Sequence, residues 1–372
     1  MAEREVLDLD VLFVGAGPAS LAGAIHLKRL LSESGTEASV AVLEKASEIG
    51  AHSLSGAIVD PRALRELFPD YPDTDLPFEA EVSEEHLYYL TENKKIPFPF
   101  VPPSMSHHHC FVTSLGKLTR WLGNKCENEG VDIFCGFAGT ELMYEGEQVV
   151  GVRTGDRGID KNGEKKPQFE PGADIRAKVV ILGEGTRGSL TKNLIDRHEL
   201  MQGCNPQVWA VGVKELWQMP SGTVPPGYVA HTMGFPLGQA IFGGAFLYGM
   251  QNDVWDLGLV VGLDYQNPGV DSHHELQRLK NHPWIRSLLS SGKMIAYGAK
   301  SLPEGGWYSI PKLSVGGAML IGDSAGFMNG QRLKGIHLAM KSGMLAAETT
   351  AEALATGKFS ESDLADYDSR VG

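Results

Sequence analysis

The chain has 372 residues, which is enough to bury a large core and form two domains, and 42% of them are hydrophobic, as in globular proteins. Its net charge of −13 provides no basic surface for nucleic acid and disfavours electrostatic attachment to anionic lipid. No stretch of about 18 apolar residues is present to span a bilayer.

Four cysteines occur in the chain: Cys110, Cys126, Cys135 and Cys204. They lack the Cys-x-x-Cys spacing of common metal and iron–sulfur sites. The segment Met1–Asp10 is charged and has no signal or transit pattern. We therefore expect reduced thiols in a cytosolic compartment.

A strand, a glycine turn and a helix are predicted near the start. Asp10–Ser20 reads Asp-Val-Leu-Phe-Val-Gly-Ala-Gly-Pro-Ala-Ser, and Leu21–Leu31 continues with helical periodicity. The free N–H groups at the start of such a helix can hold a pyrophosphate. Val40–Leu43 predicts a second strand, and the carboxylate of Glu44 after it suits the ribose of an adenine nucleotide. This order favours a nucleotide site over a plain glycine turn.

The next segments are less specific. Lys45–Gly56 is rich in small residues and predicts either a loop over the cofactor or an ordinary surface loop, and Pro61–Phe68 predicts a short helix. Ile96–Met105 is apolar but rich in proline, so it is neither a helix nor a central strand. It is either an exposed membrane or partner contact, or a loop packed on the second domain. For His107–Cys110 we expect no metal, because neighbouring side chains in an extended chain diverge.

Two more glycine turns are predicted in the nucleotide-binding part. A helix at 115–126 and strands at 131–134, 139–144, 148–154 and 175–182 are expected, with a polar, turn-rich segment at 155–171. Gly183–Gly188 follows the last of these strands and leads into a helix at 190–195. Gly322–Gly326 follows the apolar run 318–321, and Asp323 is there either to bind a ribityl chain or to cap a helix.

An antiparallel sheet and several helices complete the prediction. The sheet is expected from strand-like runs at 209–216, 228–232, 240–248 and 257–263. Gly243–Gly244 within it indicates either close approach of a ligand or a bulge. Helices are predicted at 273–289, 333–354 and 361–367, the second with a small-residue face made by Gly335, Ala339, Ser342 and Ala346.

Three loops in this order are similar to flavoproteins of the glutathione reductase and aromatic hydroxylase class. Four stretches resemble one family within it, electron transfer flavoprotein–ubiquinone oxidoreductase: Ala51–Gly56, Leu257–Pro268, Ile295–Ala299 and Met340–Glu348. The second of these stretches is the most specific. The resemblance extends from Asp10 to about Tyr367.

The resemblance implies an α/β (α+β) fold: an FAD-binding Rossmann-like domain with an inserted antiparallel quinone-binding domain. The expected boundaries are 8–84, 112–206 and 303–372 for the FAD domain, and 85–111 and 207–302 for the quinone-binding and membrane-contact domain. It implies transfer of electrons from reduced electron transfer flavoprotein through FAD to ubiquinone. No catalytic side chain is nominated, because the flavin carries the chemistry.

The resemblance also implies three groups of site residues. The expected FAD-binding residues are Gly15, Gly17, Pro18, Ala19, Ser20, Glu44, Lys45, Ser55, Gly56, Gly185, Gly322, Asp323 and Gly335. The expected quinone-binding residues are Phe242, Gly243 and Gly244. The expected membrane contacts are Phe98, Phe100 and Val101.

Several residues depart from the family pattern. Ser20 replaces the third fingerprint glycine, Phe242 stands where the family often has tyrosine, and Lys334–Leu338 reads Lys-Gly-Ile-His-Leu in place of Lys-Gly-Thr-His-Thr. The family's C-terminal part with four cluster cysteines is absent, so its 4Fe-4S cluster has no ligands here. We therefore expect a fragment, or a chain that uses a separate ferredoxin-like domain or subunit.

The implied location is peripheral and monotopic, on the cytoplasmic face of a bacterial inner membrane or the matrix side of the mitochondrial inner membrane. The alternative enzyme class is an FAD monooxygenase or a prenyl (geranylgeranyl) reductase that uses NAD(P)H, which Gly183–Arg187 faintly resembles. A flavin-binding scaffold without turnover is the alternative that is not an enzyme.

Overall fold

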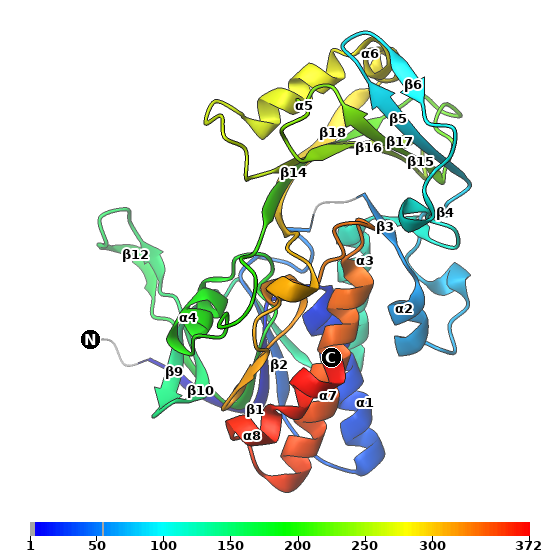
Figure 1. The fold of residues 1–372 in the computed structure, drawn as a ribbon. Helices are drawn as coiled ribbons and strands as arrows, with labels where there is room; N and C mark the ends of the chain where they lie inside the picture. The colour runs from blue at the N-terminus through cyan, green and yellow to red at the C-terminus, as the bar shows by residue number, and fades with distance from the viewer. Residues whose placement is uncertain (1–3, 54–55) are drawn as a thin grey trace.

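The computed structural model describes residues 4–53 and 56–372, and its two large β-sheets lie at opposite ends of the molecule (Figure 1). One sheet has eight strands and forms the lower part of the view in Figure 1, and the other has seven strands and forms the upper part. Each sheet has a hydrophobic core of its own. The glycine loops follow strands of the lower sheet.

The eight-stranded sheet has the order β19-β20-β13-β1-β2-β8, with β10 and β9 continuing from β13. Its strands are β1 (Val6–Val14), β2 (Val40–Glu44), β8 (Asp132–Cys135), β9 (Gly139–Glu145), β10 (Gln148–Thr154), β13 (Asp174–Leu182), β19 (Ser314–Val315) and β20 (Ala318–Leu320). Strands β20, β13, β1, β2 and β8 are parallel. Continuous apolar runs form them because both faces of a parallel sheet are buried. The strands predicted in this part are confirmed.

Helices α1 (Pro18–Ser34) and α7 (Ile336–Thr356) pack side by side against this sheet (Figure 1). A Cβ atom built at Gly343 would lie 2.0 Å from the carbonyl oxygen of Ala19, and one at Gly23 would lie 2.7 Å from the oxygen of Gly343. The two backbones therefore touch. The small-residue face predicted for α7 is confirmed, because Ala339, Ser342 and Ala346 are buried. The closest contact with α1 is made by Gly343, which the prediction did not include.

The remaining elements outside the seven-stranded sheet and its helices are shorter than α1 and α7. They are α2 (Arg62–Leu67), α3 (Leu115–Asn128), α4 (Ser189–Arg197), α8 (Glu361–Leu364), α9 (Asp366–Val371), β3 (Ala57–Val59), β4 (Ala80–Glu81), β7 (Phe111–Thr113), β11 (Arg157–Ile159), β12 (Lys165–Glu170), η1 (Asp73–Asp75), η2 (Pro103–Met105), η3 (Trp307–Ser309) and η4 (Gly322–Ser324). The prediction for 155–171 was incomplete, because β11 and β12 pair as an antiparallel hairpin there. Its strands are polar and mostly exposed, so they carry no hydrophobic signal.

The seven-stranded sheet has the order β18-β14-β17-β16-β15-β5-β6. Its strands are β5 (Glu84–Leu90), β6 (Lys95–Pro97), β14 (Trp209–Gln218), β15 (Tyr228–Gly234), β16 (Gly243–Met250), β17 (Val254–Gly262) and β18 (Lys293–Pro303). The antiparallel arrangement of β14 to β17 is confirmed, whereas β5 joins β15 in parallel. Helices α5 (Ser272–Lys280) and α6 (Pro283–Leu289) cover one face (Figure 1).

The proline-rich segment lies at one edge of this sheet. Pro97 ends β6, which among the described strands pairs only with β5, and Phe98–Val101 continues without regular structure. The prediction that this segment is neither a helix nor a central strand is confirmed, because proline is tolerated at an edge. Within the described residues, no helix is long and apolar enough to cross a membrane.

Candidate functional site

The turn after β1 is held against the end of β13. Gly15 has φ = +94°, and a Cβ atom there would lie 2.6 Å from the carbonyl oxygen of Gly183. The N–H of Gly15 donates to Leu43 at 2.7 Å, and the N–H of Gly183 donates to Val14 at 2.9 Å. Glycine is required at position 15 by both backbone conformation and space.

Gly17 faces open space. It is the N-cap of α1, with Pro18 as the first helical residue, and no side chain caps this helix end. A Cβ atom at Gly17 would meet nothing within 4 Å. Uncapped N–H groups and the positive end of the helix dipole face this space, so a pyrophosphate fits there.

Glu44 is attached to the same turn from the end of β2. Its Oε2 accepts a hydrogen bond from the N–H of Ala16 at 2.9 Å, and its Oε1 accepts one from the N–H of Ala46 at 2.7 Å. The carboxylate is half-buried beside the turn, whereas Lys45 is exposed. This position is compatible with the predicted contact between Glu44 and a ribose.

The third glycine loop reaches the start of α1. Gly322 has φ = +59°, its N–H donates to Ser342 Oγ at 2.9 Å, and a Cβ atom there would lie 2.9 Å from that of Ala19. Asp323 follows, and its Oδ2 accepts a hydrogen bond from Thr186 Oγ1 at 3.3 Å. Burial raises the pKa of Asp323 above its ordinary value, against the lowering effects of Lys300 and of the Thr186 hydroxyl.

The second loop joins the third. Gly185 has φ = +82°, and its carbonyl oxygen accepts a hydrogen bond from Ser324 Oγ at 3.1 Å. The structure thus brings together all three loops that the sequence predicted from separate strands. Gly335 is the uncapped N-cap of α7. Ser55 lies outside the described residues.

Gly56 lies beneath the seven-stranded sheet. It has φ = +88°, and a Cβ atom there would lie 1.3 Å from Asp256 Oδ2, so the position admits only glycine. The carbonyl oxygen of Gly56 accepts a hydrogen bond from Lys214 Nζ at 3.3 Å. Gly56 therefore meets strands β14 and β17.

The glycine pair in β16 has a structural role of its own. A Cβ atom at Gly243, where φ is +144°, would lie 2.1 Å from the carbonyl oxygen of Val260, and one at Gly244 would lie 2.3 Å from that of Thr232. Close approach of neighbouring strands therefore accounts for both glycines. The preceding Phe242 is 55% exposed and free to contact a ligand.

The predicted membrane contacts are accessible. Phe98 is 40% exposed and Phe100 is 68% exposed, whereas Val101 is half-buried. Ile96 beside them is also exposed. The exposed alternative for this segment is therefore favoured over a loop packed on the second domain.

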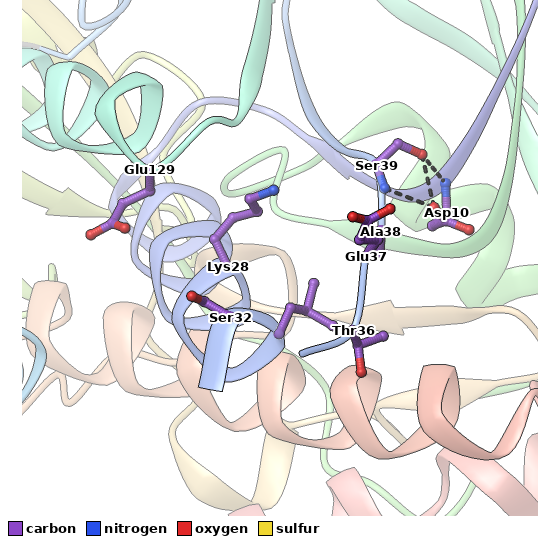
Figure 2. A pocket seen from close by; sticks show the side chains of 9 residues that line it. Asp10, Lys28, Ser32, Thr36, Glu37, Ala38, Ser39 and Glu129 are labelled. Atoms are coloured by element: carbon purple, nitrogen blue, oxygen red, sulfur yellow. Dashed lines mark hydrogen bonds between the residues drawn. The ribbon is translucent and has the colours of Figure 1, made fainter. Parts of the chain in front are cut away.

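A hollow of about 600 Å³ lies at the other end of the parallel strands (Figure 2). Lys28, Glu129 and Ser39 are among its lining residues. Asp10 Oδ2 accepts hydrogen bonds there from the N–H of Ser39 at 2.7 Å and from its hydroxyl at 3.0 Å. Asp10 and Ser39 directly precede the buried runs of β1 and β2, whereas the glycine turns follow the strands, so the hollow is separate from the candidate site.

Comparison with known proteins identifies the relatives of this chain. The family model "ETF-QO, ubiquinone-binding" matches residues 209–302. The mitochondrial electron transfer flavoprotein-ubiquinone oxidoreductase of Oryza sativa subsp. japonica is 44% identical over 363 residues, which cover 96% of this chain and 62% of that protein. The Homo sapiens protein is 46% identical and the probable Acinetobacter baylyi protein is 44% identical, covering 93% and 98% of this chain and 57% and 65% of those proteins.

Over nearly its whole length, this chain is similar to electron transfer flavoprotein-ubiquinone oxidoreductases. The resemblance predicted from the sequence is confirmed. The chain spans about three-fifths of the length of these relatives.

Solved structures of flavin enzymes share the fold. A geranylgeranyl bacteriochlorophyll reductase-like protein from Thermoplasma acidophilum has a TM-score of 0.74 at 20% identity, covering 98% of this chain and 83% of that one. A flavin-dependent brominase has a TM-score of 0.67 at 15% identity, with coverage of 98% and 83%. At these identities the likeness concerns the fold alone. The predicted α/β class with a Rossmann-like FAD-binding fold is confirmed.

Some buried ionisable groups were missed by sequence reasoning. Lys334 is 4% exposed, its Nζ has no hydrogen-bond partner among the described residues, and burial lowers its pKa to about 8. His107 is buried and bonded through Nδ1 to Glu85, and its ring stacks on that of His231 with centroids 5.1 Å apart. Only the fold brings these residues together. In the described part of the chain, no cluster of three or more histidine, cysteine, aspartate or glutamate side chains could hold a metal.

Proposed function

We propose that this chain is the FAD- and quinone-binding part of an electron transfer flavoprotein–ubiquinone oxidoreductase. It takes electrons that originate from reduced electron transfer flavoprotein and delivers them to ubiquinone. The observation that carries the proposal is the combination, in one chain, of three convergent glycine loops with the ubiquinone-binding match over residues 209–302. The names of relatives covering 93–98% of the chain support the choice of donor and acceptor.

The candidate loops support a proposal of how FAD binds. The open space at Gly17 suits the pyrophosphate, Glu44 suits the adenosine ribose, and Asp323 suits the ribityl chain. Bound FAD would supply the two-electron chemistry. The protein's part is to bind and orient FAD, exclude water and set its potential. The other FAD-binding residues proposed are those of the three loops, Lys45, Ser55–Gly56 and Gly335.

We further propose two functional parts within the chain. Residues 8–84, 112–206 and 303–372 hold FAD, and residues 85–111 and 207–302 hold the quinone and contact the membrane. Phe242 and the adjoining glycine backbone are the proposed quinone contacts. The exposed side chains of Phe98 and Phe100 support peripheral attachment to a membrane surface.

The 4Fe-4S step is proposed to need a ferredoxin-like domain or subunit in addition to these residues. The four cysteines are dispersed in the fold: Cys110 and Cys126 are buried, and Cys135 and Cys204 are half-buried. Reduced electron transfer flavoprotein should therefore reduce the chain slowly alone and faster when a ferredoxin-like protein is added. Rapid reduction of the chain alone, with iron assayed as absent, would contradict this part of the proposal.

The experiment that tests the function class is an anaerobic titration of the FAD-loaded chain with NADH and with NADPH. We expect neither nucleotide to bleach the flavin within the time in which dithionite does. Rapid bleaching by NADPH would assign the chain to the monooxygenase or prenyl reductase class instead. Failure of the purified chain to bind added FAD would remove the basis of the proposal.

A further inference from the structure

A fully buried carboxylate lies on the inner face of the seven-stranded sheet. Asp256 of β17 is 0% exposed, and neither carboxylate oxygen has a hydrogen-bond partner among the described residues. Its Oδ2 lies directly over Gly56, the proposed FAD-binding residue. An isolated carboxylate in such a place is costly when ionised, so it favours the protonated form.

Two ionisable side chains face Asp256 from the strands beside it. Tyr248 of β16 is directly opposite in the strand register. Leu216 of β14 is opposite on the other side, so Lys214, two residues before it, shares the same face. Lys214 Nζ donates a hydrogen bond to the Gly56 carbonyl oxygen at 3.3 Å. Gly56, which packs against Asp256, has no side chain and so adds no charge beside the carboxylate.

Glu215, which follows Lys214 in β14, has a separate function. Glu215 points to the outer face, where Lys280 of α5 lies 2.8 Å from its Oε1. That ion pair attaches α5 to the sheet. Lys214 and Asp256 have no such attachment to a helix. They face the space between the sheet and the Gly56 loop.

The proton balance of the proposed reaction leaves one proton for such a group to supply. A quinone takes up two electrons and two protons to become a quinol. Oxidation of an anionic reduced flavin releases two electrons and one proton. One further proton must therefore come from the protein or from solvent in each turnover. A positioned acid speeds such a transfer by roughly 10²–10⁴-fold.

We infer that Asp256, on the same sheet face as Lys214, holds the additional proton that quinone reduction consumes. This inference rests on the proposed function. The O–H bond of Asp256 breaks, the proton passes along hydrogen-bonded water over the roughly 13 Å that four strand residues span, an O–H bond forms on a quinone oxygen, and solvent then returns a proton to Asp256. Gly244 and Tyr248 lie four residues apart on the same face of β16, so the proposed quinone site and the acid share one face of the sheet.

The protonation state can be measured without FAD. Burial raises the pKa of Asp256 against the lowering effect of Lys214, and exposed aspartates are ionised at about pH 6. We expect the infrared carbonyl band of a protonated carboxyl group at this pH in the FAD-free chain, and its reduction in Asp256→Asn. Glu304→Gln is the matched control, because burial also raises the pKa of Glu304, to about 7. A band unchanged by Asp256→Asn would overturn the inference.

The kinetic test is single-turnover oxidation of reduced flavin by a short-chain ubiquinone between about pH 5 and pH 9. No transfer in the wild-type chain would refute the proposed function itself. Given transfer, we expect the wild-type rate to fall as pH rises through the pKa of Asp256. In Asp256→Asn the rate should be lower by roughly 10²-fold or more and lose this pH dependence. Unchanged rates and an unchanged pH profile would overturn the inference.

A second variant keeps the test decisive if Asp256→Asn fails to fold. Lys214→Met removes the positive charge that lowers the pKa of Asp256. The pH at which the rate falls should therefore move upward. A purely structural role for the pair would alter stability or FAD affinity and leave this midpoint unmoved. An unmoved midpoint in a folded, FAD-loaded Lys214→Met chain would overturn the inference.

Discussion

The hydroxyl of Ser20 occupies the space that a side chain at Gly183 would need: a Cβ atom at position 183 would lie 2.2 Å from Ser20 Oγ. Ser20 Oγ is buried and has no hydrogen-bond partner in the described part of the chain. Ser20 replaces the third fingerprint glycine, and the missing side chain at Gly183 makes room for it. Close packing of α1 on the end of β13 is therefore preserved by a glycine on the opposite element.

This relationship predicts coupled effects on stability. Gly183→Ala should destabilise the chain by about 1–3 kcal/mol, because it overpacks the contact with Ser20. The same change should cost clearly less in the Ser20→Ala background, where the clashing oxygen is absent. Urea denaturation of the FAD-free chains, arranged as a double-mutant cycle, measures the difference. Equal costs in both backgrounds would show that the two residues do not compete for space.

Gly17→Val should prevent FAD binding without unfolding the chain. The new side chain enters the open space proposed for the pyrophosphate, where a Cβ atom meets nothing within 4 Å. The matched control is Gly238→Val, because a Cβ atom at Gly238 also has nothing within 4 Å and the loop lies between β15 and β16. Flavin absorbance per protein should be lost in the first variant and kept in the second. Full flavin content in Gly17→Val would place the pyrophosphate elsewhere.

The strands and turns of the nucleotide-binding part could be predicted because they depend on local sequence patterns. Its parallel strands are continuous apolar runs, and each glycine loop comes directly after one, so β1, β13 and β20 and their turns were all predicted. Strand β18 was not predicted. Its residues Lys293–Ile295 and Tyr297 are exposed at the sheet edge, so it lacks the alternation that marks a half-buried strand.

The buried charges could not be predicted for a different reason. Asp256 and Lys214 share one face of the sheet beside Gly56, and Lys334 is buried just before α7, only because segments far apart in the chain fold together. Sequence patterns register periodicity and spacing, and neither reports a contact between distant strands. The glycine pair Gly243–Gly244 shows the converse. The sequence predicted a close approach at these two glycines, and the structure shows one, but the groups that approach are the backbones of neighbouring strands.

Membrane attachment should depend on the exposed apolar segment. Replacing Phe98, Phe100 and Val101 by serine removes apolar surface worth roughly 1.5–3 kcal/mol for each fully buried side chain. Liposome co-sedimentation should fall while FAD content holds. Ile159→Ser is the control, because Ile159 is also 40% exposed and lies on the separate β11–β12 hairpin. Binding that disappears at high salt in the wild-type chain would instead indicate an electrostatic attachment.

Phe242 is the better probe of the quinone site, because larger residues at Gly244 would collide with the backbone of Thr232. Phe242→Ala should raise the KM for a short-chain ubiquinone several-fold without loss of FAD, since the exposed ring is removed and the strand contacts stay. Steady-state kinetics with a fixed reductant provide the measurement. The site lies elsewhere if KM and kcat both stay at their wild-type values.

Acid should destabilise the chain through His231. This histidine is buried, its Nε2 lies 3.0 Å from the Tyr248 hydroxyl oxygen, and burial lowers its pKa to about 3. The unfolded chain then binds more protons below about pH 6.5, so stability is lost as pH falls, by about 2 kcal/mol at pH 5. His231→Gln should flatten this dependence, and exposed His108→Gln should not. Parallel profiles for wild type and His231→Gln would rule out this assignment.

The most direct test of the proposed function is anaerobic stopped-flow mixing of the FAD-loaded, dithionite-reduced chain with a short-chain ubiquinone. The proposal locates the flavin-to-quinone step entirely within these 372 residues. It therefore predicts that flavin absorbance returns at a rate that rises with quinone concentration and then saturates. A flavin that stays reduced, in a chain that retains its FAD and its fold, would contradict the central claim.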